Sequence, residues 1–127
     1  RQDSAEQPLR ADTAYIISDI LADPNASYLS RKSVFTTNGT KVSVINGVES
    51  EGHTASTVHF SPKYVVGFWA LSDDQGITGF AETFTQPVAS EWMKAAHANS
   101  GPFSRSKPSG VKELTFPLSR PLRVVPQ

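Results

Sequence analysis

The run YVVGFWAL at residues 64–71 constrains the fold more than any other part of the sequence. Its β-branched and aromatic residues favour an extended strand. A second β-rich run, at residues 57–60, precedes it, and Ser61-Pro62-Lys63 separates the two, which predicts an antiparallel hairpin. Because the later run is apolar at successive positions rather than at alternate ones, we expect a central strand that helices cover on both faces.

The dipeptide Asn38-Gly39 predicts another tight turn earlier in the chain. It lies between Val34-Phe35 and residues 42–44, which are rich in valine. Asparagine and glycine both tolerate the positive φ that a primed hairpin turn requires. We therefore expect a strand, a two-residue turn and a second strand here.

Helical patterns flank these strands. Asp12 is the candidate N-cap of a first helix, which Pro24 would end. The stripe of that helix that we expect to be half-buried consists of Ala14, Ile17 and Leu21, with Ile16 and Ile20 beside it. A second helix is expected to begin at Thr85 or Gln86, with Pro87 in its first turn. Its expected buried stripe consists of Val88, Trp92, Ala95 and Ala96. The predicted class is α+β, with an antiparallel sheet of about three to five strands flanked by an N-terminal and a C-terminal helix.

The distribution of residue types predicts one folded unit with irregular ends. The chain has 127 residues, of which 38% are hydrophobic, enough for one modest core. Residues 1–11 form a polar lead, residues 12–98 contain most of the periodic apolar positions, and residues 99–127 are rich in Ser, Pro and Gly. We expect that last segment to be an irregular tail.

The composition excludes several classes of function. Lys plus Arg and Asp plus Glu number 12 each, so no net field attracts nucleic acid or anionic lipid. No cysteine is present, which excludes disulfides, thiolate metal sites and a cysteine nucleophile. His53, His59 and His97 lack metal-site spacing, so we expect solvated or strand-paired histidines, and neither a metal nor a cofactor. No apolar run approaches the roughly 20 residues that cross a bilayer.

Several motifs, in order, resemble one enzyme family. The strand-like run 64–69 is followed by Ser72-Asp73-Asp74, by GITG at residues 76–79 and by PVASEWM at residues 87–93. These segments are similar to the end of class A penicillin-binding transpeptidases, which carry a PxΦVVGVW strand (Φ, an apolar residue), an NDD turn, a GxTG segment and a PIWxxFM helix. The resemblance covers about residues 11–111 and includes the first predicted helix. It implies the C-terminal part of a transpeptidase domain.

The resemblance also implies where the cleft-lining strand should lie. Members of the family carry a Lys-Thr/Ser-Gly-Thr/Ser motif on that strand. Counting back from Phe60-Ser61-Pro62, which is similar to the end of the family's Gly-Tyr-Thr-Pro, places this third motif at Ile45-Asn46-Gly47-Val48. Only the glycine is retained, and an apolar isoleucine occupies the position of the lysine that helps to bind the substrate carboxylate and tune the serine.

The other catalytic motifs of the family are missing from the sequence. A nucleophilic serine needs an adjacent base, which the family supplies as Ser-x-x-Lys. The one match, Ser104-Arg105-Ser106-Lys107, lies after the final helix, and Lys107 precedes a proline that disfavours helical backbone. No Ser-x-Asn occurs. We therefore predict no catalytic residue in this chain.

Four acidic residues lie in segments typical of loops and turns, and two tryptophans lie on predicted elements. The acidic residues are Glu49, Glu51, Asp73 and Asp74, for which solvated loops and turns are expected. Trp69 and Trp92 fall on apolar faces of predicted elements, so we expect core anchors rather than a ligand platform.

The resemblance implies two alternative functions. The leading hypothesis is a catalytically inactive transpeptidase-like module, with a structural or interaction role in peptidoglycan synthesis in the cell envelope. The alternative is a subunit or cleaved fragment of an active D,D-transpeptidase whose serine lies on another chain. Because the family's sheet has five strands, about three would remain here, with the open edge of the strand at residues 64–71 exposed. Another polypeptide, either the upstream half or a second copy, is then expected to complete the sheet, and peptidoglycan is a further candidate ligand.

Overall fold

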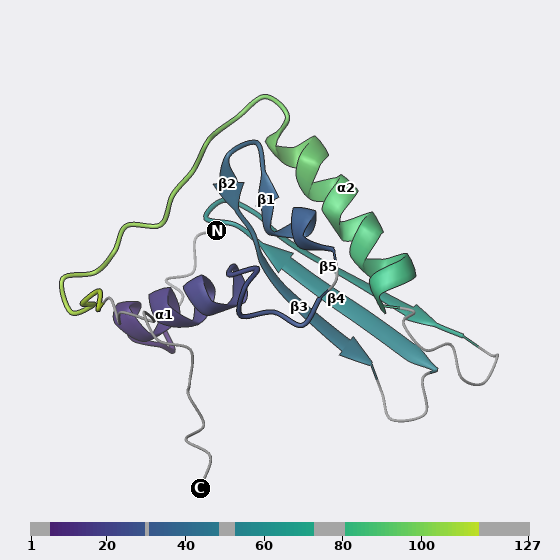
Figure 1. Ribbon diagram of the computed structural model, residues 1–127, viewed down its shortest axis with the longest axis horizontal. Coiled ribbons are helices and arrows are strands. Elements are labelled where there is room, and N and C mark those ends of the chain that lie inside the picture. Colours follow the sequence, from purple (N-terminus) through teal and green to yellow (C-terminus); the bar gives the residue numbers. More distant parts are fainter. Residues whose placement is uncertain (1–5, 30, 49–52, 73–80, 115–127) are drawn as a thin grey trace, which may run out of the picture.

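The computed structural model describes residues 6–29, 31–48, 53–72 and 81–114. Its elements, in order, are α1 (Ala11–Leu21), η1 (Lys32–Phe35), β1 (Thr36–Thr37), β2 (Thr40–Lys41), β3 (Ser43–Val48), β4 (Thr54–Phe60), β5 (Val65–Leu71), η2 (Ala81–Thr85) and α2 (Gln86–His97). Figure 1 shows α2 lying along the main sheet and α1 at one end of it. The predicted α+β class, with an antiparallel sheet between an N-terminal and a C-terminal helix, is confirmed.

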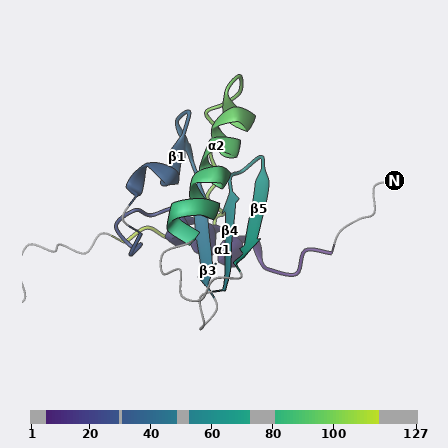
Figure 2. The same cartoon turned by 90° about the vertical axis from the view of Figure 1, so that its right-hand side faces the viewer.

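The main sheet is antiparallel and has the order β3-β4-β5. Figure 2 shows the three strands side by side, with β5 at an outer edge. The β4–β5 register pairs Phe60 with Val65 and Thr54 with Leu71, and the backbone N–H of Ser61 donates to the carbonyl of Tyr64 across the turn, at 2.8 Å. The predicted hairpin is therefore confirmed.

The prediction that β5 is a central strand covered on both faces is wrong. In the described part of the chain β5 pairs only with β4, and its exposure alternates along the strand. Val65, Trp69 and Leu71 are 70%, 72% and 66% exposed, whereas Val66 is buried. The side chains on one face pack under α2, and no described element covers those on the other face along β5. The apolar residues of β5 would suit burial on both faces of the strand. Among the described elements, only α2 covers one of those faces.

The turn at Asn38-Gly39 forms as predicted, but its flanking strands are shorter. Asn38 and Gly39 have φ of 45° and 73°, and β1 and β2 are two residues each. Val34 and Phe35, expected in a strand, lie in the 3₁₀ turn η1 and are 3% and 2% exposed. A short helical turn buries both side chains on the same side, which an extended strand of alternating side chains cannot do.

Asn38 joins this hairpin to the end of α2. Its side-chain amide donates to the carbonyls of His97 (2.9 Å) and Ser100 (3.0 Å). We expect Asn38→Ala to lower the free energy of unfolding by about 1–3 kcal/mol, because two hydrogen bonds are lost and alanine is strained at positive φ. Urea unfolding followed by circular dichroism measures this. Asn38→Gly, which restores the backbone freedom alone, should recover part of the loss.

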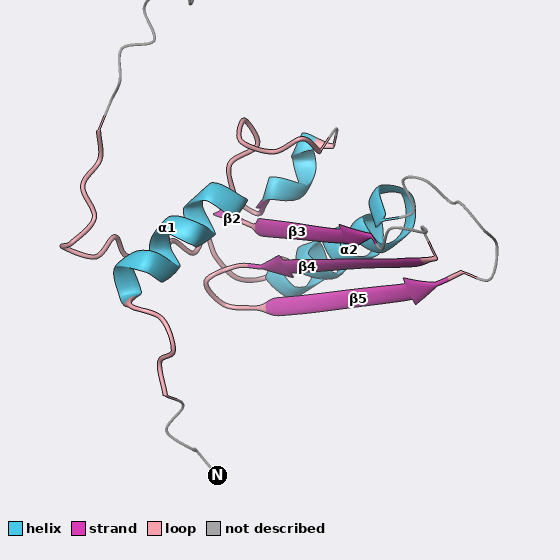
Figure 3. Cartoon of the chain, turned by 90° about the horizontal axis from the view of Figure 1, so that it is seen from below, coloured by secondary structure: helices cyan, strands magenta, loops and turns pink. Residues whose placement is uncertain are grey.

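The first helix differs from its prediction in its start and its burial. It begins at Ala11, so Asp12 lies inside the first turn, where its carboxylate accepts from the backbone N–H of Thr13 at 2.8 Å rather than capping the helix. Of the expected half-buried stripe, Ala14 and Leu21 are half-buried as predicted, whereas Ile17 is 43% exposed. No residue of α1 is fully buried. Figure 3 shows α1 lying across one end of the sheet rather than flat on its face.

The buried face of α2 is rotated from the predicted one. The helix begins at Gln86, preceded by Thr85, and has Pro87 in its first turn, as expected. However, its buried residues are Gln86, Ala89, Met93 and His97. Val88 and Trp92 are 40% and 41% exposed, so neither belongs to the core. Gln86 and His97 are buried because Asn46 and Ser61 on the sheet side of the helix form hydrogen bonds with them. The spacing of apolar residues alone does not reveal such polar contacts.

The core lies between α2 and the main sheet, beneath η1. Its buried residues are Leu29, Val34, Phe35, Val42, Val44, Val66, Ala89 and Met93, with Tyr64 and Phe68 packed against them. Residues 99–114 leave α2 without forming a helix or strand and return to α1 (Figure 1). The backbone N–H of Phe103 donates to the Thr40 hydroxyl at 2.9 Å, which ties this segment to the hairpin.

Candidate functional site

The third-motif positions lie on β3, an edge strand in the described part of the sheet. Asn46 points to the α2 side, where its amide donates to Gln86 Oε1 (3.0 Å) and its oxygen accepts from the Thr57 hydroxyl (2.6 Å). Its neighbour Ile45 therefore points to the opposite face, where it is 45% exposed. Val48 continues the strand by pairing with Ala55.

Ile45 lines a pocket of about 200 Å³ between β3 and the end of α1. The pocket is lined by Ile20, Leu21, Ala26, Ser27, Tyr28, Leu29, Val44, Ile45 and Asn46. None of these side chains is charged, so nothing in the lining can neutralise a substrate carboxylate. The pocket can accept an apolar group, but it lacks both an activated nucleophile and a base.

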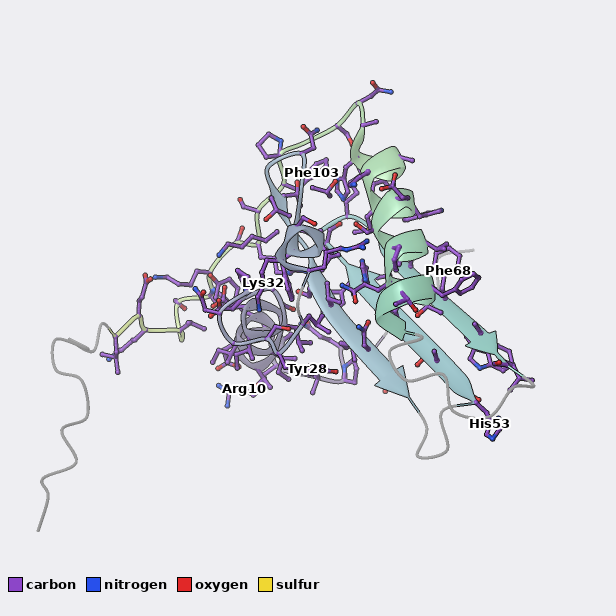
Figure 4. The ribbon with its side chains drawn as sticks, turned by 45° about the vertical axis from the view of Figure 1, so that its right-hand side comes forward. Arg10, Tyr28, Lys32, His53, Phe68 and Phe103 are labelled. Carbon is purple, nitrogen blue, oxygen red and sulfur yellow. The ribbon has the colours of Figure 1, made fainter. Side chains whose placement is uncertain are left out.

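Lys32 supplies an ammonium group near this pocket, but that group is used to close a loop. Its Nζ donates to the carbonyls of Pro24 (2.6 Å) and Ser27 (2.8 Å), which fixes the loop that forms one wall. Figure 4 shows Lys32 and Tyr28 on this side of the molecule. In this arrangement Lys32 therefore holds the loop closed, and its ammonium group is already hydrogen-bonded to two carbonyls.

Gly47, the glycine of the predicted third motif, has a packing reason to be glycine. A Cβ atom at Gly47 would lie 2.8 Å from Ser56 Oγ on the neighbouring strand, so a side chain there would force Ser56 to move. The close approach of β3 and β4 is thus sufficient reason for a glycine at position 47.

The Ser104-Arg105-Ser106-Lys107 match has none of the geometry of a catalytic pair. These residues lie in irregular chain after α2, so serine and lysine do not face each other across one helical turn. Lys107 Nζ lies 3.6 Å from the carboxylate of Glu113.

A serine and a histidine that the sequence did not bring together do meet. Ser61 Oγ lies 2.9 Å from His97 Nε2, and both residues are buried. The same oxygen accepts from the backbone N–H groups of Lys63 and Tyr64. His97 Nδ1 has no hydrogen-bond partner among the described residues, so no acid orients the ring as in a catalytic triad. The pair joins the β4–β5 turn to α2. In the sequence, the only sign of this contact is a serine at a predicted turn, where serine commonly hydrogen-bonds to nearby backbone groups.

His59 is the most unusual titratable group in the core. It lies on β4, paired with Val44 and Val66, which is the strand-paired one of the two expected settings. Its side chain is fully buried, and neither ring nitrogen has a hydrogen-bond partner among the described residues. Removal from water disfavours the charged form and lowers the pKa of His59 from 6.5 to about 4. At neutral pH it is an uncharged core residue.

The remaining candidates add no site. Glu49, Glu51, Asp73 and Asp74 lie outside the described residues. Trp69 and Trp92, expected as core anchors, are both exposed, so that prediction is wrong. Across residues 6–29, 31–48, 53–72 and 81–114 no group of three His, Asp or Glu side chains could hold a metal ion. Within the same ranges no helix has the length and apolar character to cross a bilayer.

Comparison with known proteins found no matching family model, no matching curated protein and no matching solved structure.

Proposed function

We propose that this chain is a catalytically inactive, penicillin-binding-protein-like transpeptidase fragment that serves as a structural or interaction module in peptidoglycan synthesis, in the extracytoplasmic cell envelope. The main support is the position of Ile45, which lies beside a pocket on an edge strand where an active enzyme of that family needs an ammonium group. An isoleucine can neither neutralise a carboxylate nor assist a serine.

The arrangement of the elements is compatible with this proposal. Three strands run in the order β3-β4-β5, and a C-terminal helix crosses them, as the end of a five-stranded transpeptidase sheet would. The open edge of β5 and the exposed side chains Val65 and Trp69 support the further proposal that another polypeptide, either an upstream transpeptidase half or a second copy, completes the sheet.

The alternative is a subunit of an active D,D-transpeptidase whose serine lies on another chain. It is favoured by one observation: β3 has a partner strand on one side only within the described residues, so its outer edge could line a cleft through backbone groups near Gly47. Peptidoglycan would then be the substrate of the assembled enzyme rather than a ligand of this chain.

Labelling with a fluorescent penicillin distinguishes the two. We expect no covalent label on this chain, either alone or mixed with a separately expressed upstream transpeptidase half, because no acylable serine is activated here. An active penicillin-binding protein labelled in parallel is the control. Label on the upstream half only when this chain is added supports the split enzyme, and label on this chain itself contradicts both hypotheses.

A further inference from the structure

We propose that the second polypeptide at β5 is a second copy of this chain, paired antiparallel along β5 about a twofold axis at Phe68, which gives one continuous six-stranded sheet. This inference rests on the part of the proposed function in which another polypeptide completes the sheet. It commits to one partner and to one register, and four features of the strand support it.

The outer edge of β5 presents a regular row of backbone groups. Ser61 and Ser72 donate their N–H groups to the carbonyls of Tyr64 and His53, which fixes the phase of the β4–β5 ladder. Because hydrogen-bonded pairs alternate along an antiparallel ladder, the N–H and C=O groups that point away from β4 belong to Val65, Gly67, Trp69 and Leu71. No described strand pairs with them.

The strand carries none of the features that protect an exposed edge. Natural edge strands are blunted by charged side chains, by proline or by bulges. Residues 65–71 include no charged residue and no proline, and the β4–β5 register runs without a bulge. The whole chain has a formal net charge of zero, so two copies do not repel each other through a net field.

The strand is complementary to itself in one register. With Phe68 on the axis, Val65 lies opposite Leu71 and Gly67 lies opposite Trp69 of the other copy. The four outward-facing residues are then the hydrogen-bonded pairs, as an antiparallel ladder requires. Trp69, which is 72% exposed, would cover the bare backbone of Gly67, and a cross-strand aromatic side chain over a glycine stabilises a sheet.

Apolar side chains flank this edge on both faces of the sheet. On one face are Val65, Trp69 and Leu71, all more than 60% exposed. On the other is Trp92 of α2, 41% exposed, whose ring lies 6.1 Å from that of Tyr64 at the start of β5. Figure 4 shows Phe68 beside α2 at this side of the molecule. A stable interface buries about 800 Å² per partner around an apolar, uncharged centre, and these residues supply such a centre.

A single introduced cysteine tests the register. The chain contains no cysteine, so Phe68→Cys has one thiol per copy. On the axis, in a non-hydrogen-bonded pair, the two Cα atoms lie about 4.5 Å apart, which a disulfide can bridge. Ala70→Cys is the matched control, because its two copies lie about 14 Å apart along the strands and cannot be bridged. We expect Phe68→Cys to form a covalent dimer under mild oxidation and Ala70→Cys to remain monomeric on a non-reducing gel.

Sedimentation of the unmodified chain and of two charge variants tests the edge independently of any cysteine. We expect a dimer for the full chain, and for Trp69→Lys a dimer dissociation constant raised by at least about 30-fold, as expected when a central aromatic contact is lost. Ile45→Lys places the same ammonium on the same face of the sheet at the other edge strand, and it should leave the dimer intact. Circular dichroism verifies that each variant is folded.

The outcomes separate this inference from the proposed function. A folded monomer at all concentrations overturns the proposed dimer. Equal cross-linking of Phe68→Cys and Ala70→Cys also overturns it. So does a dimer that Ile45→Lys disrupts and Trp69→Lys does not. A monomer that binds an upstream transpeptidase half through β5 also overturns it, in favour of that partner. None of these results changes whether penicillin acylates the chain, which is the test of the proposed function.

Discussion

Replacing Met93 with alanine is expected to lower the free energy of unfolding by about 2–5 kcal/mol, the range for large-to-small changes in a packed core. Met93 is 1% exposed and lies in the cluster between α2 and the sheet. The removed atoms leave a cavity that the neighbouring strand and η1 cannot readily fill. Urea unfolding monitored by circular dichroism, with the slope held constant between variants, measures the loss.

Val88→Ala is the matched control for that change. Val88 lies on the same helix but is 40% exposed, and alanine has the higher helix propensity, so we expect a change within about 0.5 kcal/mol. The opposite result, a large loss of stability for Val88→Ala and none for Met93→Ala, would contradict this account. It would mean that α2 packs on the sheet through the Val88 face that apolar spacing predicts, and not through the Met93 face.

Acid is expected to destabilise the chain through His59, beginning at pH values above those that protonate carboxylates. The pKa of His59 is lowered in the folded state from 6.5 to about 4, so between those values the unfolded chain binds a proton that the folded chain does not. Stability attributable to this group is therefore complete above about pH 6.5 and lost as the pH falls toward 4, to a total of roughly 3 kcal/mol.

His59→Gln isolates this contribution. Glutamine keeps a polar side chain but does not titrate in this range, so the difference in unfolding free energy between the two proteins should change by roughly 3 kcal/mol from pH 7 to pH 4. A difference between the original chain and His59→Gln that stayed flat across this pH range would show that the ring has access to water or to a partner.

His59→Leu is expected to stabilise the chain at neutral pH by about 1–3 kcal/mol. Neither ring nitrogen has a hydrogen-bond partner among the described residues, and an unsatisfied buried polar group costs about that much. Thermal unfolding at pH 7 measures the gain. A lower melting temperature for His59→Leu than for the original chain contradicts the description of the ring as unpaired.

The sequence predicted those parts of the fold that local chemistry determines. Asn38-Gly39 requires positive φ, Ser61-Pro62-Lys63 separates two β-rich runs, and Pro87 suits the first turn of a helix, and all three features lie where they were expected. Each depends on backbone preferences of a few adjacent residues. Tertiary contacts did not override them.

Burial was predicted less well, because it depends on elements that are distant in the sequence. Spacing marked Val88 and Trp92 as core and ignored Gln86 and His97, whose burial requires Asn46 and Ser61 as partners. The apolar run of β5 indicated cover on two faces, whereas the described elements provide it on one. Periodicity identifies which residues could be buried, but partners decide which ones are.

The candidate site divides in the same way. Counting along the chain from the family resemblance assigned residues 45–48 to the predicted cleft-lining strand. In the structure Ile45 lies on β3 and lines a pocket, but its proposed part in a cleft stays a prediction. Neither the Ser61–His97 contact nor the burial of His59 could be predicted from sequence spacing. Both arise only when α2 packs on the sheet. Neither is the serine–lysine pair that acyl transfer uses in penicillin-binding proteins.

The intact mass of the chain after long incubation with excess penicillin tests the absence of acyl chemistry most directly. We predict a single unmodified species at neutral pH, because the proposed function has Ile45 in place of the lysine that would activate a serine. A covalent adduct that maps to any serine of the chain, and that disappears when that serine is replaced by alanine, would contradict it.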